Sequence, residues 1–169
     1  MKSKFNLFRV QGKIKILPLI ALTLLPVLGS GLIYYLTKDG INVYSTLEKP
    51  IFSPPPFIFM IVWPILYILM GLASYRIYML RDQGENIGSA LFFYIVQLLL
   101  NYLWPILFFS LRLYGVSFIE LVILLIFIVI TFIEFFKLDK ISGILLIPYI
   151  IWVAFAGVLN FFLWMKNEM

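Results

Sequence analysis

Residues 116–136, VSFIELVILLIFIVITFIEFF, decide the fold. The stretch is 21 residues long, and its only charged side chains are two glutamates near its ends. An α-helix needs ~20 mostly apolar residues to cross the hydrocarbon core of a bilayer. The stretch therefore predicts a transmembrane helix, and four further stretches of the same kind accompany it.

The five predicted spans cover most of the chain, at residues 16–36, 57–80, 89–111, 116–136 and 143–165. A basic N-terminal arm precedes them at 1–15, and a short tail follows at 166–169. The first apolar stretch is longer than the ~7–15 residues of a signal-peptide core, so we interpret it as a retained helix. The chain is therefore predicted to be an all-α integral membrane protein, a single five-transmembrane-helix bundle over residues 16–165.

The composition supports this fold class. Hydrophobic residues make up 63% of the chain and charged residues 12%, with a mean hydropathy of +1.06. Soluble domains have roughly 45–50% apolar and about 25% charged residues, so a soluble enzyme, a nucleic-acid binder and a disordered chain are all disfavoured. The chain has no Cys and no His. We therefore expect no metal site and no strong axial ligand for haem iron.

The distribution of Lys and Arg predicts the orientation in the membrane. Nine of these residues lie on the side of the N-terminus and four lie on the other side. Because Lys and Arg concentrate on the cytoplasmic side, the N-terminus is predicted to be cytoplasmic in a plasma membrane. The first loop and the C-terminus would then lie outside.

The first loop, residues 37–56, differs from the other connections. It has 20 residues and ends in three consecutive prolines, Pro54 to Pro56. Long loops in compact proteins are usually functional or disordered, and consecutive prolines favour a stiff extended backbone. We therefore expect an ordered lid over one end of the bundle.

Ionisable residues inside the predicted spans lie near their ends. Arg76, Glu120 and Glu134 are each within five positions of a span end. Long charged side chains at such positions can reach the headgroups, so we expect all three to do so. The absence of a charge near a span midpoint argues against a proton-coupled pump or an ion channel.

Neutral polar and aromatic residues form a stripe on each of three spans. Because steps of three and four residues keep side chains on one helix face, each stripe should point into the bundle. One interpretation is tight packing with hydrogen bonds between helices, and the other is a ring-lined cavity for a flat apolar ligand. The stripes are Trp63, Tyr67, Met70 and Ser74; Gln97, Asn101, Trp104 and Phe108; and Tyr149, Trp152, Ala156 and Asn160.

Three blocks of sequence resemble the signature of the TspO/MBR family of translocator and tryptophan-rich sensory proteins. They are 44–56 (YSTLEKPIFSPPP), 97–104 (QLLLNYLW) and 145–156 (LLIPYIIWVAFA). The blocks fall on the first loop and on the third and fifth spans, in family order, and the second span carries Trp63 and Tyr67 between them. The resemblance therefore covers nearly the whole chain.

The resemblance implies a five-helix membrane bundle that binds a porphyrin or a related tetrapyrrole beneath the first loop. It requires no cofactor and implies that two copies can associate as a homodimer. The implied ligand-binding residues are Tyr44, Pro50, Trp63, Tyr67, Asn101, Trp104, Phe108, Trp152, Ala156 and Asn160. Eight of these also belong to the stripes, which favours a pocket over simple packing.

Some positions depart from the family pattern. Many members carry Trp where this chain has Val43 and Phe52, and a serine is common at Pro105. The cholesterol motif proposed for the family needs a Tyr where this chain has Phe161, so no sterol binding is predicted. The carboxylates of a porphyrin would need cations on the lid side, and the candidates are Lys38, Lys49 and Arg112.

Three functions stay open at this level. The first is a membrane receptor or sensor for a porphyrin, and the second is a small-molecule transporter. The third, implied by some bacterial relatives, is light-dependent porphyrin breakdown with Trp63 and Trp152 as redox candidates. No acid–base pair or nucleophile is arranged in the sequence, so we assign no catalytic residue.

Overall fold

The computed structural model describes residues 7–169, leaving aside the side chain of residue 41. Five of its helices are long and apolar enough to cross a membrane, which confirms the predicted fold class. The helices are α1 (Ile16–Ile41), α2 (Val43–Thr46), α3 (Pro56–Leu80), α4 (Gly88–Pro105), α5 (Tyr114–Leu138) and α6 (Lys140–Asn167). A short 3-10 turn, Arg81–Gln83, follows α3, and a π-helical turn, η2 (Ile106–Ser110), follows α4.

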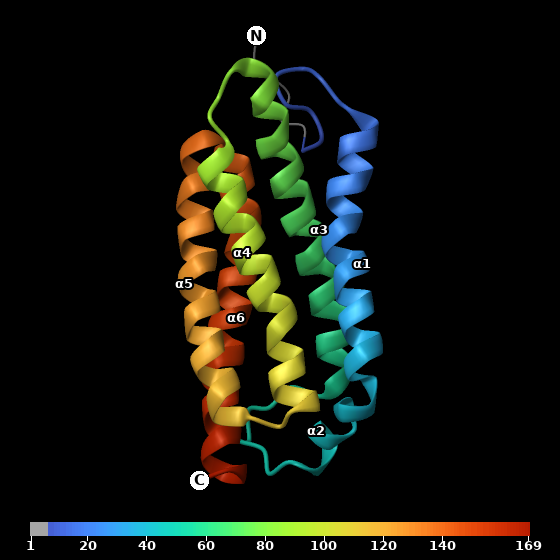
Figure 1. Ribbon diagram of the computed structural model, residues 1–169, viewed down its shortest axis with the longest axis vertical. Helices are drawn as coiled ribbons and strands as arrows, with labels where there is room; N and C mark the ends of the chain where they lie inside the picture. The colour runs from blue at the N-terminus through green and yellow to red at the C-terminus, as the bar shows by residue number, and fades with distance from the viewer. Residues whose placement is uncertain (1–6) are drawn as a thin grey trace.

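The long helices stand side by side as an elongated bundle (Figure 1). Helix α5 packs mainly against α6 and α4, α1 packs mainly against α3, and α3 also packs against α6. Helix α1 is the least buried of the five spans. The lid segment with α2 and the C-terminus lie at one end, and the N-terminal segment lies at the other (Figure 1).

The first loop is shorter than the sequence predicts because helical structure extends into it. Helix α1 continues to Ile41, five residues past the predicted end, and Lys38 in its last turn favours this extension by facing the negative end of the helix dipole. Residues 47–55 then cross the end of the bundle without regular structure. Pro55 is extended, with φ −63° and ψ 150°, and Pro56 occupies the first turn of α3, where its missing N–H is harmless.

Residues 7–15 pack onto the end opposite the lid. Val10 and Lys13 form a two-residue β-bridge around a turn in which Gln11 and Gly12 have φ of 48° and 82°. Val10 is only 4% exposed and belongs to the main hydrophobic core. The predicted arm is therefore a hairpin seated on the bundle over this range, while its residues 1–6 lie outside the described residues.

The expectation that Arg76 and Glu120 reach the headgroups is wrong. Arg76 is 4% exposed, and its guanidinium binds the Asp139 carboxylate through two hydrogen bonds of 2.7 and 3.0 Å. Glu120 is 6% exposed and is enclosed by the bundle. Arg76 stays inside because Asp139, the N-cap of α6, lies opposite it once α3 and α6 pack together. Only Glu134 lies at the surface as expected, paired with Lys137 at 2.9 Å.

Helix α1 approaches α3 closely at Gly71. A Cβ atom at this position would lie 2.5 Å from the Cα of Thr23 and 2.7 Å from the carbonyl oxygen of Leu22. Such distances leave no room for a side chain. Gly71 therefore serves packing within the bundle.

Candidate ligand-binding site

A hydrogen-bonded network of four side chains lies at the centre of the bundle, and we call it the central network: Tyr67, Gln97, Asn101 and Tyr149. The Tyr67 hydroxyl donates to Oδ1 of Asn101 at 2.5 Å. Nδ2 of Asn101 donates to the Tyr149 hydroxyl at 2.9 Å, and that hydroxyl donates to Oε1 of Gln97 at 2.9 Å. The network joins α3, α4 and α6, because the predicted stripes of these helices do point inward.

A second polar cluster lies nearer the lid, and we call it the lid-side cluster: Trp104, Tyr114, Ser117 and Asn160. Oδ1 of Asn160 accepts from the Trp104 indole at 2.9 Å and from the Ser117 hydroxyl at 3.0 Å. Nδ2 of Asn160 donates to the backbone carbonyl of Tyr114 at 2.8 Å. Both amide ends of Asn160 are thus satisfied within the bundle.

The π-helical turn positions the aromatic side chains of the lid end. This turn follows Pro105 and widens the end of α4. It places Phe108 against Trp104 in a stacked contact of 4.9 Å between ring centroids, and edge-on against Tyr114 at 5.0 Å. Phe108 is consequently buried at 2% exposure.

The two tryptophans predicted as redox candidates contact different rings. Trp63 stacks on Tyr67 at 5.6 Å and meets Tyr149 edge-on at 6.5 Å. Trp152 contacts Phe59 at 5.6 Å and Phe155 at 5.7 Å. We call these contacting rings of α3 and α6 the aromatic wall. It has two separate parts: the rings around Trp63 lie beside the central network, and the rings around Trp152 lie toward the lid.

A groove of about 710 Å³ opens beside Trp152, between α3 and α6 and below Pro54 of the lid. Its size falls within the ~300–1,000 Å³ of small-molecule sites. Ile65 and Ile151, which line it, are 52% and 64% exposed, so the groove opens on the outer surface of the bundle. Its lining is Pro54, Val62, Ile65, Leu66, Ile147, Pro148, Ile151, Trp152 and Phe155.

The Trp152 side chain has an unsatisfied donor. Its indole nitrogen Nε1 is buried and has no hydrogen-bond partner among the described residues. An indole N–H can only donate, and leaving it unsatisfied costs free energy.

The lid is fastened to the end of α6 through Glu48. Its carboxylate pairs with Nζ of Lys166 at 2.8 Å, and its backbone N–H and C=O both bond to the Asn167 amide, at 2.8 and 3.0 Å. The hydrogen bond and charge of Lys166 lower the pKa of Glu48. Phe52 adds edge-on contacts to Phe162 and Phe155, at 5.5 and 6.4 Å. Phe52 thus supplies a ring in the lid where many family members carry Trp.

The two predicted ligand-binding residues of the lid are both buried. Tyr44 is 8% exposed and meets Phe59 edge-on at 5.8 Å. Pro50 accepts a hydrogen bond from the backbone N–H of Ser53 at 3.0 Å, which closes a turn in the lid. Phe59 belongs to the stretch that resembles the family signature but is not among the predicted ligand-binding residues, although it lies one turn before Trp63 on the same helix face.

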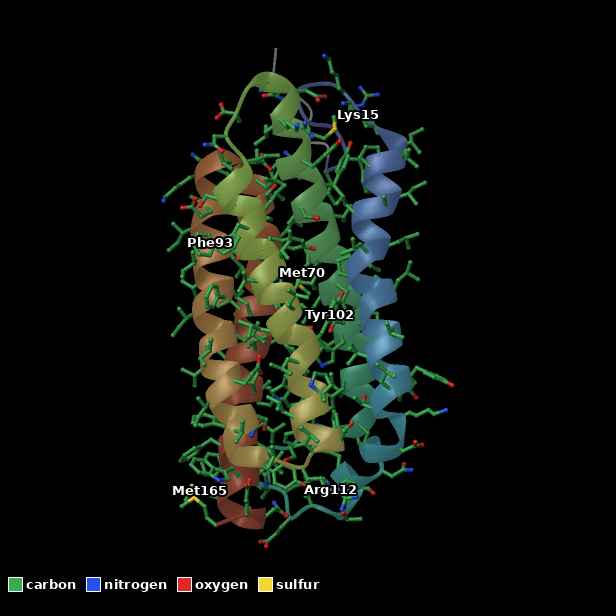
Figure 2. The ribbon with its side chains drawn as sticks, in the orientation of Figure 1. Lys15, Met70, Phe93, Tyr102, Arg112 and Met165 are labelled. Atoms are coloured by element: carbon green, nitrogen blue, oxygen red, sulfur yellow. The ribbon has the colours of Figure 1, made fainter. Side chains whose placement is uncertain are left out.

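The three candidate cations all lie at the lid end, as Figure 2 shows for Arg112, far from Lys15 at the other end. The ammonium of Lys49 lies 4.9 Å from the centre of the Tyr44 ring, and that of Lys38 lies 4.5 Å from the Tyr35 ring. Arg112 is exposed and has a φ of 55° in the turn before α5. Lys49, over a buried ring of the lid, is the best placed to reach a ligand beneath it.

The ten predicted residues fall into several groups in the structure. Tyr67 and Asn101 join the central network, Trp104 and Asn160 join the lid-side cluster, and Ala156 is buried in the core. Trp152 is the one among them that lines the groove. Their assignment as ligand-binding residues stays a prediction.

Comparison with known proteins gives concordant matches. The model of the family described as TspO/MBR family matches residues 21–165. Protein CrtK of Rhodobacter capsulatus is 37% identical over 124 residues, which cover 73% of this chain and 78% of the relative. The translocator protein of Bos taurus is 35% identical over 153 residues, covering 89% and 90%. The tryptophan-rich protein TspO of Archaeoglobus fulgidus is 34% identical over 154 residues, covering 90% and 98%.

Proposed function

The chain belongs to the TspO/MBR family, and on that premise we propose that it is a membrane receptor or sensor for a porphyrin or a similar flat hydrophobic ligand. Family membership and the five spans establish an integral, multi-pass membrane protein and support a receptor or transporter role. The observation that carries the finer proposal is the apolar groove beside Trp152, roofed by the lid and backed by the aromatic wall.

The groove has the properties that a flat ring requires. Its walls are apolar, so a ligand gains free energy by leaving water. Trp152 and Phe155 offer ring faces, and each aromatic contact adds roughly 0.5–1.5 kcal/mol beyond burial. Lys49, on the adjoining lid, supplies a cation for a carboxylate.

We further propose the orientation that the charges predict. The N-terminus lies in the cytoplasm, and the lid and the C-terminus lie outside a plasma membrane. The groove then opens toward the lipid in the outer half of the bilayer. A hydrophobic ligand would reach it from the membrane and would need no metal or further cofactor. Association of two copies as a homodimer belongs to the same proposal.

The experiment is a titration of the purified protein with protoporphyrin IX, followed by quenching of tryptophan fluorescence. Replacing Trp152 by Ala removes the largest side chain that lines the groove, so we expect affinity to fall about tenfold or more, ~1.4 kcal/mol. Trp63→Ala should weaken binding less, because Trp63 backs the central network instead of lining the groove.

The matched control is Trp164→Phe. Trp164 stacks on Phe118, at 6.0 Å, and does not line the groove. This variant should bind with the affinity of the unmodified protein. Unchanged affinity in both Trp152→Ala and Trp63→Ala would refute the proposed site.

A transporter is the second candidate, and one observation favours it. The sequence argument against transport was the lack of a charge near a span midpoint; Glu120 lies nearer a span end, but it is an ionisable group buried inside the bundle, where the sequence predicted none. Uptake of porphyrin into liposomes containing the protein, compared with empty liposomes, separates this function from binding alone.

A further inference from the structure

Glu120 is a buried carboxyl group without a partner. It lies in the second turn of α5, inside the span Tyr114–Leu138, and is 6% exposed. Both of its carboxyl oxygens are shielded from solvent, and neither has a hydrogen-bond partner among the described residues.

The other acidic residues differ from Glu120 in this respect. Glu48, Asp82, Glu134 and Asp139 each pair with a Lys or Arg, at distances between 2.5 and 2.9 Å. Glu168 accepts a hydrogen bond from the backbone N–H of Gly115 at 2.9 Å, and Asp39 and Glu85 are exposed. Of the eight acidic residues, all of which the structure describes, Glu120 is thus the one that is buried without a partner.

The surroundings of Glu120 contain no compensating charge. None of the ion pairs among the described residues contains Glu120, and no Lys or Arg donates a hydrogen bond to its carboxyl group. An unpaired carboxylate in a medium of low dielectric constant is strongly disfavoured, and such a group takes up a proton instead. The geometry of the bundle alone therefore favours a neutral carboxylic acid.

Glu120 lies beside the lid-side cluster. Ser117 of that cluster precedes it by three residues on α5, which is one helical turn toward the lid. An exchangeable hydroxyl group thus lies one turn from the carboxyl group.

The remaining titratable groups on neighbouring helices have other contacts. On α3, Tyr67 bonds to Asn101 and Arg76 bonds to Asp139 at the far end of the bundle. On α4, Tyr102 donates to the carbonyl of Pro26 at 3.0 Å, and Tyr94 stacks on Phe135. On α6, the Tyr149 hydroxyl bonds to Asn101 and Gln97, so none of these titratable groups forms a hydrogen bond with Glu120.

We propose that Glu120 is a proton-binding site inside the bundle. Its carboxyl group carries a proton while the bundle shields it from solvent, and ligand binding is linked to the fraction of molecules in which Glu120 is protonated. A proton from water binds one carboxylate oxygen and forms a neutral acid, and the reverse step returns it. The porphyrin carries two carboxylates, and their negative charge within the same bundle opposes ionisation of Glu120. Binding therefore favours the protonated form of Glu120. This linkage rests on the proposed function, whereas the occupancy of the site at neutral pH does not.

The first experiment tests occupancy without any ligand. Infrared difference spectra are recorded while the pH of the purified protein is changed, and the carbonyl stretch of a protonated carboxylic acid is followed. We expect this band at neutral pH in the unmodified protein and in Glu120→Asp, and its loss in Glu120→Gln. Glu134→Gln, on the same helix but at a paired surface carboxylate, should keep the band. A band that survives Glu120→Gln, or no band at neutral pH, would overturn the proposal.

The second experiment tests the linkage. Protoporphyrin IX affinity is measured at several pH values across the infrared titration of Glu120. In the unmodified protein and in Glu134→Gln the affinity should fall as the pH rises, because the ligand must then draw a proton onto Glu120. In Glu120→Gln this dependence should disappear, leaving only that of the ligand itself. The same pH dependence of affinity in the unmodified protein and in Glu120→Gln would disprove the linkage. No binding at any pH would refute the proposed function instead.

Discussion

The two ends of the bundle are closed by different means. Opposite the lid, Arg76 binds Asp139 and also donates to the backbone carbonyls of Leu7 and Arg9, at 2.9 and 3.2 Å. The Arg76 side chain is 5% exposed there. At the lid end the corresponding ion pair joins Lys166 to Glu48, whose side chains are 38% and 69% exposed. One pair is shielded from water and the other is immersed in it.

This difference matters because water screens an exposed pair and allows its partners to separate at little cost. A buried pair cannot open without leaving a charge unsatisfied. The N-terminal end is therefore fixed, and the lid end can open. Since the groove and the candidate cations also lie toward the lid, the end that can open is the one where we propose that the ligand binds.

The largest loss of stability should come from removing the buried ion pair between Arg76 and Asp139. Arg76→Ala leaves Asp139 without its cation and releases the backbone of residues 7–9, so we expect a loss of about 3–5 kcal/mol in the free energy of unfolding. Thermal unfolding in detergent measures the loss. Lys15→Ala, which removes the exposed pair with Asp82, is the control and should cost at most ~1 kcal/mol. Equal effects of the two variants would contradict the distinction between the ends.

Acid should weaken the fixed end in a predictable direction. Burial acts to raise the pKa of Asp139, but hydrogen bonds from Arg76 and Ser142 outweigh it, so the pKa lies below the ordinary 3.8. A lowered pKa in the folded state stabilises the fold above the unfolded value, and this contribution is lost as the pH falls through the folded value. Unfolding temperatures should therefore drop more steeply below pH 3.8 in the unmodified protein than in Asp139→Asn. Parallel pH profiles would show that Asp139 does not contribute.

The smallest effect on stability should come from the lid. Glu48→Gln removes the exposed pair with Lys166 but keeps the backbone bonds to Asn167, so we expect a change of at most ~1 kcal/mol. The same variant should nevertheless speed amide hydrogen exchange in residues 47–55, because the lid opens locally more often. Mass spectrometry of exchanged peptides measures this, with residues 7–15 as the internal control. Faster exchange at both ends would contradict a local role.

Helix positions and inward faces could be predicted from the sequence because both depend on local periodicity. The five spans are confirmed, and so is the family resemblance. The spacing of Gln97 and Asn101 correctly predicts a buried face, since steps of four residues return to the same side of a helix. End positions were less accurate, because α1 and α6 continue beyond the apolar stretch as helices.

Pairings between distant residues could not be predicted in this way. Arg76 and Asp139 lie 63 positions apart, and only the packing of α3 on α6 brings them together. Glu120 is likewise buried, although its position near a span end predicted exposure. The hairpin of residues 10–13 and the π-helical turn after Pro105 also depend on contacts that a window of sequence does not contain.

The contact between α1 and α3 has a consequence for biogenesis. These helices emerge from the ribosome one after the other, and the close approach at Gly71 requires no later segment. Helices α5 and α6 likewise pack onto the neighbour that was synthesised just before them, whereas α4 packs mainly against the helix that follows it. Because chains fold from the N-terminus during synthesis, the junction of α3 with α6 must be completed last. The groove beside Trp152 is lined by residues of both α3 and α6, so the proposed ligand site forms only when this last interface is complete.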